Sequence, residues 1–190
     1  MYDKIVKKIE EYDDIAIYRH INPDFDAFGS QFGMYDLIKT TYPDKNVYVC
    51  GEFSSELVAK YDVLVDYRDV DYSKDVLGIV LDTANQERID DQNYKLCKEI
   101  IKIDHHIVVD SYGQINFEDS TASSASQLVV DLYQNTKLQI SKAGAGALYL
   151  GIIGDTARFL YRSTDKRTFK AASTLIETGI DIVSLYDRMY

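Results

Sequence analysis

Aspartate and histidine side chains stand directly after three short apolar runs of this 190-residue sequence. The run 15–19 leads into His20-Ile-Asn-Pro-Asp24-Phe-Asp26, a second run ends at Asp82, and a third ends at Asp104-His105-His106. All 3 histidines of the chain belong to these segments. Carboxylates and imidazoles act as ligands of divalent metal ions or as acid–base groups.

A fourth acid, Asp155, lies in the apolar segment 151–156, where a carboxylate is unfavourable unless it is paired. Taken singly, each residue has a simpler interpretation, because Asp82 could cap a turn, the His pair could be exposed, and Asp155 could be a helix cap or a satisfied core acid. Aspartates gathered beside histidines, however, would repel one another unless cations neutralised them. We therefore predict a metal site at Asp24, Asp26, Asp82, Asp155 and the histidines.

The elements that must position these residues alternate between β-rich and amphipathic segments. This alternation predicts an α/β fold with a mainly parallel β-sheet, helices on both faces and the metal site at the C-terminal ends of the strands. The expected strands cover residues 15–20, 46–50, 77–82, 99–104 and 115–117, and the expected helical segments cover residues 2–13, 28–40, 91–98, 124–136, 142–153 and 165–178. Residues 55–66 are ambiguous, and we interpret them as a short helix followed by a strand at 63–65.

Composition limits the class of protein. A hydrophobic content of 46% with 27% charged residues indicates a globular domain, and no apolar run reaches the roughly 18–20 residues of a membrane-spanning helix. The 2 cysteines, without an N-terminal signal segment, favour a cytoplasmic protein. A net charge of −10 disfavours binding to long duplex nucleic acid, which relies on many lysine and arginine contacts to phosphate.

The donor set indicates the kind of metal. Carboxylates and imidazoles without a thiolate fit Mn²⁺ first, with Mg²⁺, Co²⁺ or Zn²⁺ as alternatives. Because the candidate ligands exceed what one ion takes from side chains when water also binds, we expect two ions, about 3.5–4 Å apart and sharing one carboxylate. Many phosphoester-cleaving enzymes use that arrangement to activate a water molecule.

Four motifs in this order resemble the DHH phosphoesterase superfamily. They are the segments 20–30, 80–83, 104–106 and 154–156, and the similarity covers essentially the whole chain. It is strongest to the oligoribonuclease and pAp-phosphatase branch of DHH subfamily 1. The resemblance implies a DHH-domain Rossmann-like sandwich and a Mn²⁺-dependent phosphoesterase that hydrolyses short oligoribonucleotides, 3′-phosphoadenosine-5′-phosphate (pAp), or both.

The resemblance also implies a role for each motif residue. Asp82 would take part in catalysis as the bridging ligand, His106 would reach the substrate phosphate or help to protonate the leaving oxygen, and Asp104 would orient the histidines. The implied metal ligands are His20 and Asp24 for one ion, Asp26, His105 and Asp155 for the other, and Asp82 for both. The implied substrate-binding residues are His106, Ser123, Ser124 and Arg158, although the serines equally fit a helix N-cap and Arg158 equally fits an ordinary surface arginine.

The resemblance also implies a second, substrate-binding domain (DHHA1), which we expect to be absent from this chain. We expect residues 1–179 to be the catalytic domain, residues 180–190 to begin a connector to the absent domain, and the 190-residue chain to have little activity by itself. A homodimer is left open, and no membrane partner is expected. The alternatives are a cyclic-dinucleotide phosphodiesterase or an inorganic pyrophosphatase of the same superfamily, and, outside the enzymes, a non-catalytic metal- and nucleotide-binding module.

Overall fold

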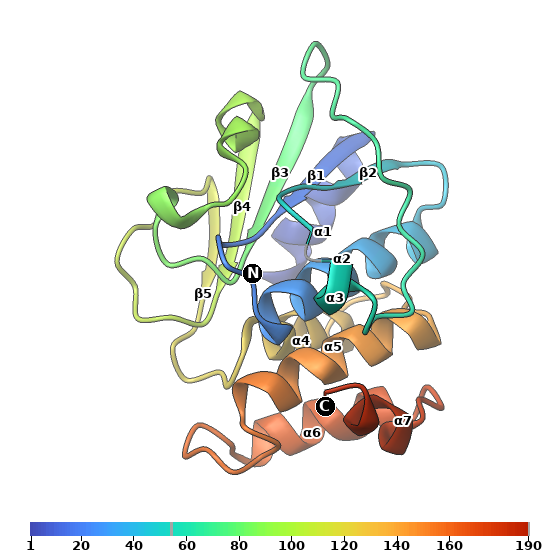
Figure 1. The fold of residues 1–190 in the computed structure, drawn as a ribbon. Coiled ribbons are helices and arrows are strands. Elements are labelled where there is room, and N and C mark those ends of the chain that lie inside the picture. Colours follow the sequence, from blue (N-terminus) through green and yellow to red (C-terminus); the bar gives the residue numbers. More distant parts are fainter. Residues whose placement is uncertain (54, 190) are drawn as a thin grey trace.

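The computed structural model describes residues 1–53 and 55–189, in which five parallel strands form one sheet (Figure 1). The order of the strands across the sheet is β2-β1-β3-β4-β5, and every neighbouring pair is parallel. This confirms the expected α/β class. The strands are β1 (Asp14–Tyr18), β2 (Asn46–Val49), β3 (Val76–Leu81), β4 (Glu99–Asp104) and β5 (Ile115–Glu118).

Helices cover the two faces of the sheet unequally. The larger core joins the sheet to the α-helices, whereas the second face is covered by two 3₁₀-helices and by the loop that precedes β3. The expected helices on both faces are thus α-helices on one face and 3₁₀-helices on the other. The α-helices are α1 (Tyr2–Glu11), α2 (Phe25–Thr41), α3 (Ser55–Val58), α4 (Ala125–Gln134), α5 (Lys142–Asp155), α6 (Lys166–Ile176) and α7 (Ile182–Asp187), and the 3₁₀-helices are η1 (Gln86–Arg88) and η2 (Gln92–Leu96).

Strand β3 runs through the centre of the sheet and is buried along its whole length. Leu77, Ile79 and Leu81 enter the α-helical core, while Val76 and Val80 enter the core on the second face. A parallel strand covered on both faces needs apolar side chains at every position, which explains its continuous apolar sequence. The carboxyl end of β3 therefore leaves the sheet next to the ends of β1 and β4.

Helices α2 and α5 approach each other closely where a glycine of one meets a glycine of the other. A Cβ atom on Gly29 would lie 2.7 Å from the carbonyl oxygen of Ala147 and 2.8 Å from Cα of Gly151. A Cβ atom on Gly151 would lie 3.0 Å from Oδ1 of Asp26. The missing side chains let the first turn of α2 and the last turn of α5 reach the same edge of the sheet.

Two predicted elements differ in the structure. The strand expected at residues 63–65 is wrong: the described sheet contains only β1 to β5, and Val63 and Val65 pack against the α-helical core from a loop. The backbone N–H of Asp66 donates to the hydroxyl of Tyr35 on α2, so a side chain takes the place of a strand partner. The segment expected as a helix at 91–98 is instead the shorter 3₁₀-helix η2, which Asp91 caps by accepting from the N–H of Asn93.

Helix α5 is the buried central helix of the α-helical layer, in contact with α2, α4 and α6. Helix α7 packs on it, with Leu185 buried and the ring of Tyr186 6.4 Å from that of Tyr149. Residues 180–189 are therefore packed against the domain, and their role as a connector stays a prediction. Among the described helices, none combines the length and the apolar character that a bilayer crossing requires.

Candidate metal centre

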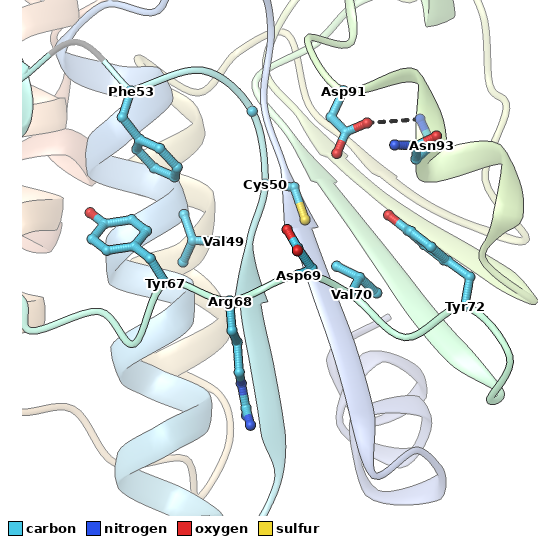
Figure 2. A pocket seen from close by; sticks show the side chains of 11 residues that line it. Val49, Cys50, Phe53, Tyr67, Arg68, Asp69, Val70, Tyr72, Asp91 and Asn93 are labelled. Atoms are coloured by element: carbon cyan, nitrogen blue, oxygen red, sulfur yellow. Dashed lines mark hydrogen bonds between the residues drawn. The ribbon is translucent and has the colours of Figure 1, made fainter.

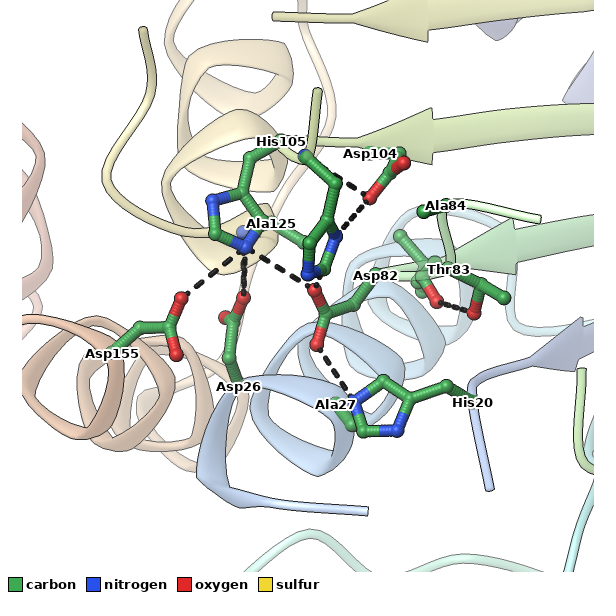
Figure 3. Close-up of polar contacts among 12 residues, drawn as sticks. His20, Asp26, Ala27, Asp82, Thr83, Ala84, Asp104, His105, Ala125 and Asp155 are labelled. Atoms are coloured by element: carbon green, nitrogen blue, oxygen red, sulfur yellow. Dashed lines mark hydrogen bonds and ion pairs between the residues drawn. The ribbon is translucent and has the colours of Figure 1, made fainter. Parts of the chain in front are cut away.

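Three strand ends bring predicted ligands to one place (Figure 3). His20 follows β1, Asp82 follows β3, and His105 follows β4. The two oxygens of Asp82 face different histidines: Oδ2 lies 3.2 Å from Nε2 of His20, and Oδ1 lies 3.3 Å from Nε2 of His105. The parallel order of the strands thus produces the juxtaposition expected from the sequence.

The backbone at Asp82 is turned out of the sheet. Its φ of 52° lies in the left-handed region, which an aspartate adopts at less cost than a β-branched residue. Its N–H still donates to the carbonyl of Ile103 at 3.0 Å, so the residue remains attached to β4. The carboxylate is held almost fully buried between the two histidines.

Three more carboxylates come from helix ends. Asp24 caps α2, where its Oδ1 accepts from the N–H groups of Asp26 and Ala27 at 3.0 Å each. Asp26 accepts from the N–H groups of Ala125 at 2.6 Å and Ser126 at 2.9 Å, at the start of α4, where the helix dipole favours a negative charge.

Asp155 has a less favourable position than the other two helix-end carboxylates. It is the last residue of α5, where the helix dipole disfavours a carboxylate. Its Oδ2 lies 3.2 Å from Nε2 of His105. Without a cation, a protonated His105 would offset this cost, and a bound cation would take over that role.

The ligand atoms fall into overlapping groups of three, each with its atoms within 4.8 Å of one another. One of these groups adds His106 to Asp82 and His105. The two groups without His106 include all six residues that the family resemblance implies as ligands. They are His20, Asp24 and Asp82 in one group, and Asp26, His105 and Asp155 in the other.

The chemistry of this donor set fits divalent ions. Oδ1 of Asp82 is buried and makes no hydrogen bond with any described residue, which is costly for a carboxylate oxygen unless a cation binds it. Nε2 of His105 lies within 3.9 Å of carboxylates from Asp26, Asp82 and Asp155. Oxygen and imidazole donors without a thiolate fit Mn²⁺, Mg²⁺, Co²⁺ or Zn²⁺.

The pKa values of the cluster report a strongly negative site. Burial lowers the pKa of His20 and of His105, but contact with Asp82 outweighs it, and for His105 the charges of Asp26 and Asp155 add to that effect. The net result raises the pKa of His20 to about 9 and that of His105 to about 10. Burial, together with the charges of Asp82 and Asp24, raises the pKa of Asp155 to about 6. Cations are therefore attracted to the cluster.

Asp104 contacts His106 and a buried lysine. Its Oδ1 lies 2.7 Å from Nδ1 of His106, and its Oδ2 lies 3.4 Å from Nζ of Lys102. Lys102 also donates to the carbonyls of Ala84 at 3.0 Å and Asp110 at 2.8 Å, which belong to the loops after β3 and β4. A proton on Nδ1 of His106, donated to Asp104, leaves Nε2 of His106 as the unprotonated ring nitrogen.

The residues predicted to bind substrate outside the motifs have other contacts. Ser124 caps α4 by accepting from the N–H of Gln127, and the Ser123 hydroxyl donates to Oε1 of Gln127 at 2.7 Å. Both serines are buried, and the N-cap alternative is confirmed for Ser124 only. Arg158 is exposed and follows Asp155 in a left-handed run of three residues, 157–159. A contact of any of these three with substrate stays a prediction.

The sequence did not indicate two residues, Ala84 and Arg88, that line the cavity of the candidate metal centre, called the metal cavity below. This cavity measures about 150 Å³. The turn-forming Asn85, which accepts from the N–H of Arg88 at 3.3 Å, was the one available signal that the chain folds back here. The other lining residues are His20, Asp24, Asp82, His105, His106 and Asp155.

The chain is similar to several known proteins. Residues 14–152 match the model of the DHH family, N-terminal domain. The chain is 44% identical over 190 residues to the "Probable bifunctional oligoribonuclease and PAP phosphatase NrnA" of Streptococcus mutans, covering 99% of this chain and 60% of that protein. It is 38% identical to the bifunctional oligoribonuclease and PAP phosphatase NrnA of Bacillus subtilis, covering 100% of this chain and 61% of that protein.

A solved structure is also similar. The crystal structure of an exopolyphosphatase-related protein from Bacteroides fragilis superposes with a TM-score of 0.82 and 28% identity, and the match covers 100% of this chain and 59% of that one. The chain thus spans about 60% of the length of the two curated relatives described above.

Proposed function

The chain belongs to the DHH family, and from that premise we propose that it is the catalytic domain of a two-metal phosphoesterase acting on short oligoribonucleotides and pAp. The observation that carries the proposal is Asp82, whose two carboxylate oxygens face His20 and His105 within a cluster of carboxylates. The names of the Streptococcus and Bacillus relatives supply the substrate class.

Two Mn²⁺ ions are the proposed cofactor. His20 and Asp24 would hold one ion, Asp26, His105 and Asp155 the other, and Asp82 both. When bound, such ions activate water at neutral pH and neutralise the charge of a phosphoryl group.

The chain's own residues would orient the reaction. Asp104 would hold His106 with Nδ1 protonated, so that Nε2 could take up the proton released by the attacking water and give that same proton to the leaving oxygen. The bonds from Ala125 and Ser126 would fix the carboxylate plane of Asp26, and the cap of α2 would fix Asp24. The arrangement therefore needs little rearrangement when substrate binds.

The domain boundary is also a proposal. We assign residues 1–179 to the catalytic domain, since the described sheet and all six ligands lie within them. The relatives' additional length agrees with a second, substrate-binding domain that would follow a connector beginning at residue 180. Activity of the 190-residue chain would accordingly be slow.

The test is single-turnover hydrolysis, with protein in excess over pAp or a diribonucleotide, in the presence of Mn²⁺. We expect slow hydrolysis of both substrates that stops on chelation of the metal and is lost in Asp82→Asn. The variant Asp181→Asn is the matched control, because asparagine caps α7 as well as aspartate does and lies outside the cluster.

Absence of hydrolysis by the unmodified chain, or equal hydrolysis by Asp82→Asn, would contradict the proposal. Parallel assays with a cyclic dinucleotide and with pyrophosphate separate the alternative activities, since faster turnover of either would reassign the substrate. Binding of Mn²⁺ and pAp without any turnover would instead indicate the non-catalytic module.

A further inference from the structure

Arg88 is the single cationic side chain of Lys or Arg type among the residues that line the metal cavity. It is exposed, and its guanidinium makes no hydrogen bond or ion pair within residues 1–53 and 55–189. Two buried or half-buried arginines, by contrast, are engaged: Arg19 pairs with Asp90, and Arg167 pairs with Asp119 and Asp131.

Arg68 shows the contrast most clearly, because it also lines a cavity. That cavity measures about 590 Å³ and lies beside β2 (Figure 2). There the guanidinium of Arg68 bonds to Oδ1 of Asn46 at 3.0 Å and lies 4.8 Å from the centre of the Tyr48 ring. Arg68 is thus occupied by protein groups, whereas Arg88 keeps its five N–H donors for a ligand.

The backbone of Arg88 is tied to the metal ligands. Its carbonyl accepts from the N–H of Ile21 at 2.8 Å, and an isolated bridge joins His20 to Ile89. Arg88 therefore keeps a fixed position relative to His20, although its side chain is exposed. An exposed side chain that is unpaired among the described residues, carried on a fixed backbone, suits a group that contacts a ligand at the mouth of the cavity.

Charge and volume indicate what that ligand is. Asp24, Asp26, Asp82 and Asp155 carry four formal negative charges, which two divalent ions would cancel. A phosphate brings further negative charge, and Arg88 is the lining group that balances it. A cavity of about 150 Å³ is well below the roughly 300–1,000 Å³ of a pocket that encloses a whole small molecule, so it admits a phosphoryl group and leaves the nucleoside outside.

We propose that Arg88 binds the non-bridging oxygens of the substrate's scissile phosphoryl group at the mouth of the metal cavity. The inference rests on the proposed function and adds to it the residue that recognises the phosphate. The guanidinium of Arg88 would donate two N–H groups to two phosphoryl oxygens, a geometry that lysine cannot reproduce.

The experiment compares unmodified protein with Arg88→Gln, Arg88→Lys and the control Lys95→Gln. Lys95 is exposed on η2, outside the cavity, and its loss changes the net charge equally. The first readout is the affinity for inorganic phosphate, measured by calorimetric titration of the Mn²⁺-loaded proteins. The second is the affinity for Mn²⁺, measured by titration of the metal-free proteins. The third is the rate of pAp hydrolysis under single-turnover conditions.

We expect Arg88→Gln to weaken phosphate binding by roughly ten- to a hundredfold and to slow pAp hydrolysis, while Mn²⁺ affinity stays within about twofold. Arg88→Lys should recover part of the loss, and Lys95→Gln should match unmodified protein. Equal phosphate affinity in Arg88→Gln and unmodified protein, or equal losses in Arg88→Gln and Lys95→Gln, would overturn the inference.

The readouts separate this inference from the proposed function. Phosphate binding that depends on Arg88, in a protein that hydrolyses nothing, would uphold the inference and reject the phosphoesterase. Metal-dependent hydrolysis that is unaffected by Arg88→Gln would uphold the phosphoesterase function and reject the inference. If the Mn²⁺-loaded protein binds no phosphate at all, the inference fails.

Discussion

Oδ1 of Asp82 lies 3.3 Å from Nε2 of His105 and, although buried, makes no hydrogen bond with any described residue. Without metal, a proton on the imidazole is what balances this carboxylate, as the raised pKa of His105 indicates. Metal ions and protons therefore compete for the same cluster, because a histidine ligand must be deprotonated.

The first prediction concerns pH and metal. In metal-free protein the pKa of His20 is raised from 6.5 to about 9 and that of His105 to about 10, so their stabilising contribution is complete below about pH 6.5 and is lost as pH rises through 9 to 10. Asp155, whose pKa is raised to about 6, disfavours the fold as it ionises between about pH 4 and 6. Added Mn²⁺ should restore the stability that is lost when His20 and His105 release their protons.

Thermal unfolding with chelator and with saturating Mn²⁺ at pH 6, 7 and 8.5 measures this competition. The Tm of the metal-free protein should fall as pH rises, and the gain in Tm from Mn²⁺ should increase by about 5 °C or more over the range. A gain that is constant with pH would mean that His20 and His105 do not bind the metal.

The second prediction concerns the number of ions. Titration calorimetry should find two Mn²⁺ ions per unmodified chain. Asp155→Asn should leave the affinity for one ion unchanged and lower the affinity for the other by about a hundredfold or more, because that ion loses one carboxylate ligand. Binding of that ion should not be abolished, because Asp26 and His105 remain. Asp82→Asn should weaken both ions, because Asp82 contacts both histidines. Equal stoichiometry in Asp82→Asn and Asp155→Asn would contradict the bridging role of Asp82.

Much of this site was predictable from sequence, because strand ends are local signals. The apolar runs before His20, Asp82 and Asp104 identify strands, and in a parallel sheet their carboxyl ends meet at one edge. The position of Arg88 was not predictable, since it depends on a 3₁₀-helix that folds back along His20. The apolar pattern at 63–65 predicted a strand that is not formed. Val63 and Val65 are partly buried against the α-helical core from a loop, and burial of this kind gives the same apolar pattern as a strand.

The third prediction concerns the crossing of α2 and α5. Gly29→Ala should lower the free energy of unfolding by roughly 1–3 kcal/mol, because its Cβ would meet backbone atoms of Ala147 and Gly151 that cannot move aside cheaply. This cost exceeds the gain in helix propensity of about 1 kcal/mol. Gly146→Ala is the control, since its Cβ would meet nothing nearer than Leu185 at 3.6 Å.

Urea unfolding of the metal-free proteins measures both variants. Gly146→Ala should be neutral or stabilising by up to about 1 kcal/mol. Equal stability of Gly29→Ala and unmodified protein would show that the two helices can separate without cost.

The fourth prediction concerns Lys102, whose ammonium is fully buried and donates to the loops after β3 and β4 and to Glu118. Lys102→Met leaves Asp104 and Glu118 without their cation and should lower the free energy of unfolding by roughly 3–5 kcal/mol. Lys98→Met removes an exposed lysine paired with Asp75 and should change it by less than about 1 kcal/mol.

Hydrogen exchange adds a local readout for the same pair of variants. Faster exchange at residues 105–113 in Lys102→Met, relative to Lys98→Met, is the expected result, because the anchor of that loop to Asp110 is lost. Unchanged exchange there would assign Lys102 to general stability alone.

Asp155, at the very end of α5, gives the proposed centre an order of assembly during translation. The ribosome releases the segment carrying His20, Asp24 and Asp82 long before it releases α5. A nascent chain would thus hold the complete donor set for one ion while the set for the other is still being synthesised. We expect the second ion to bind tightly only after α5 has emerged and packed on α2, so full loading would mark a finished domain.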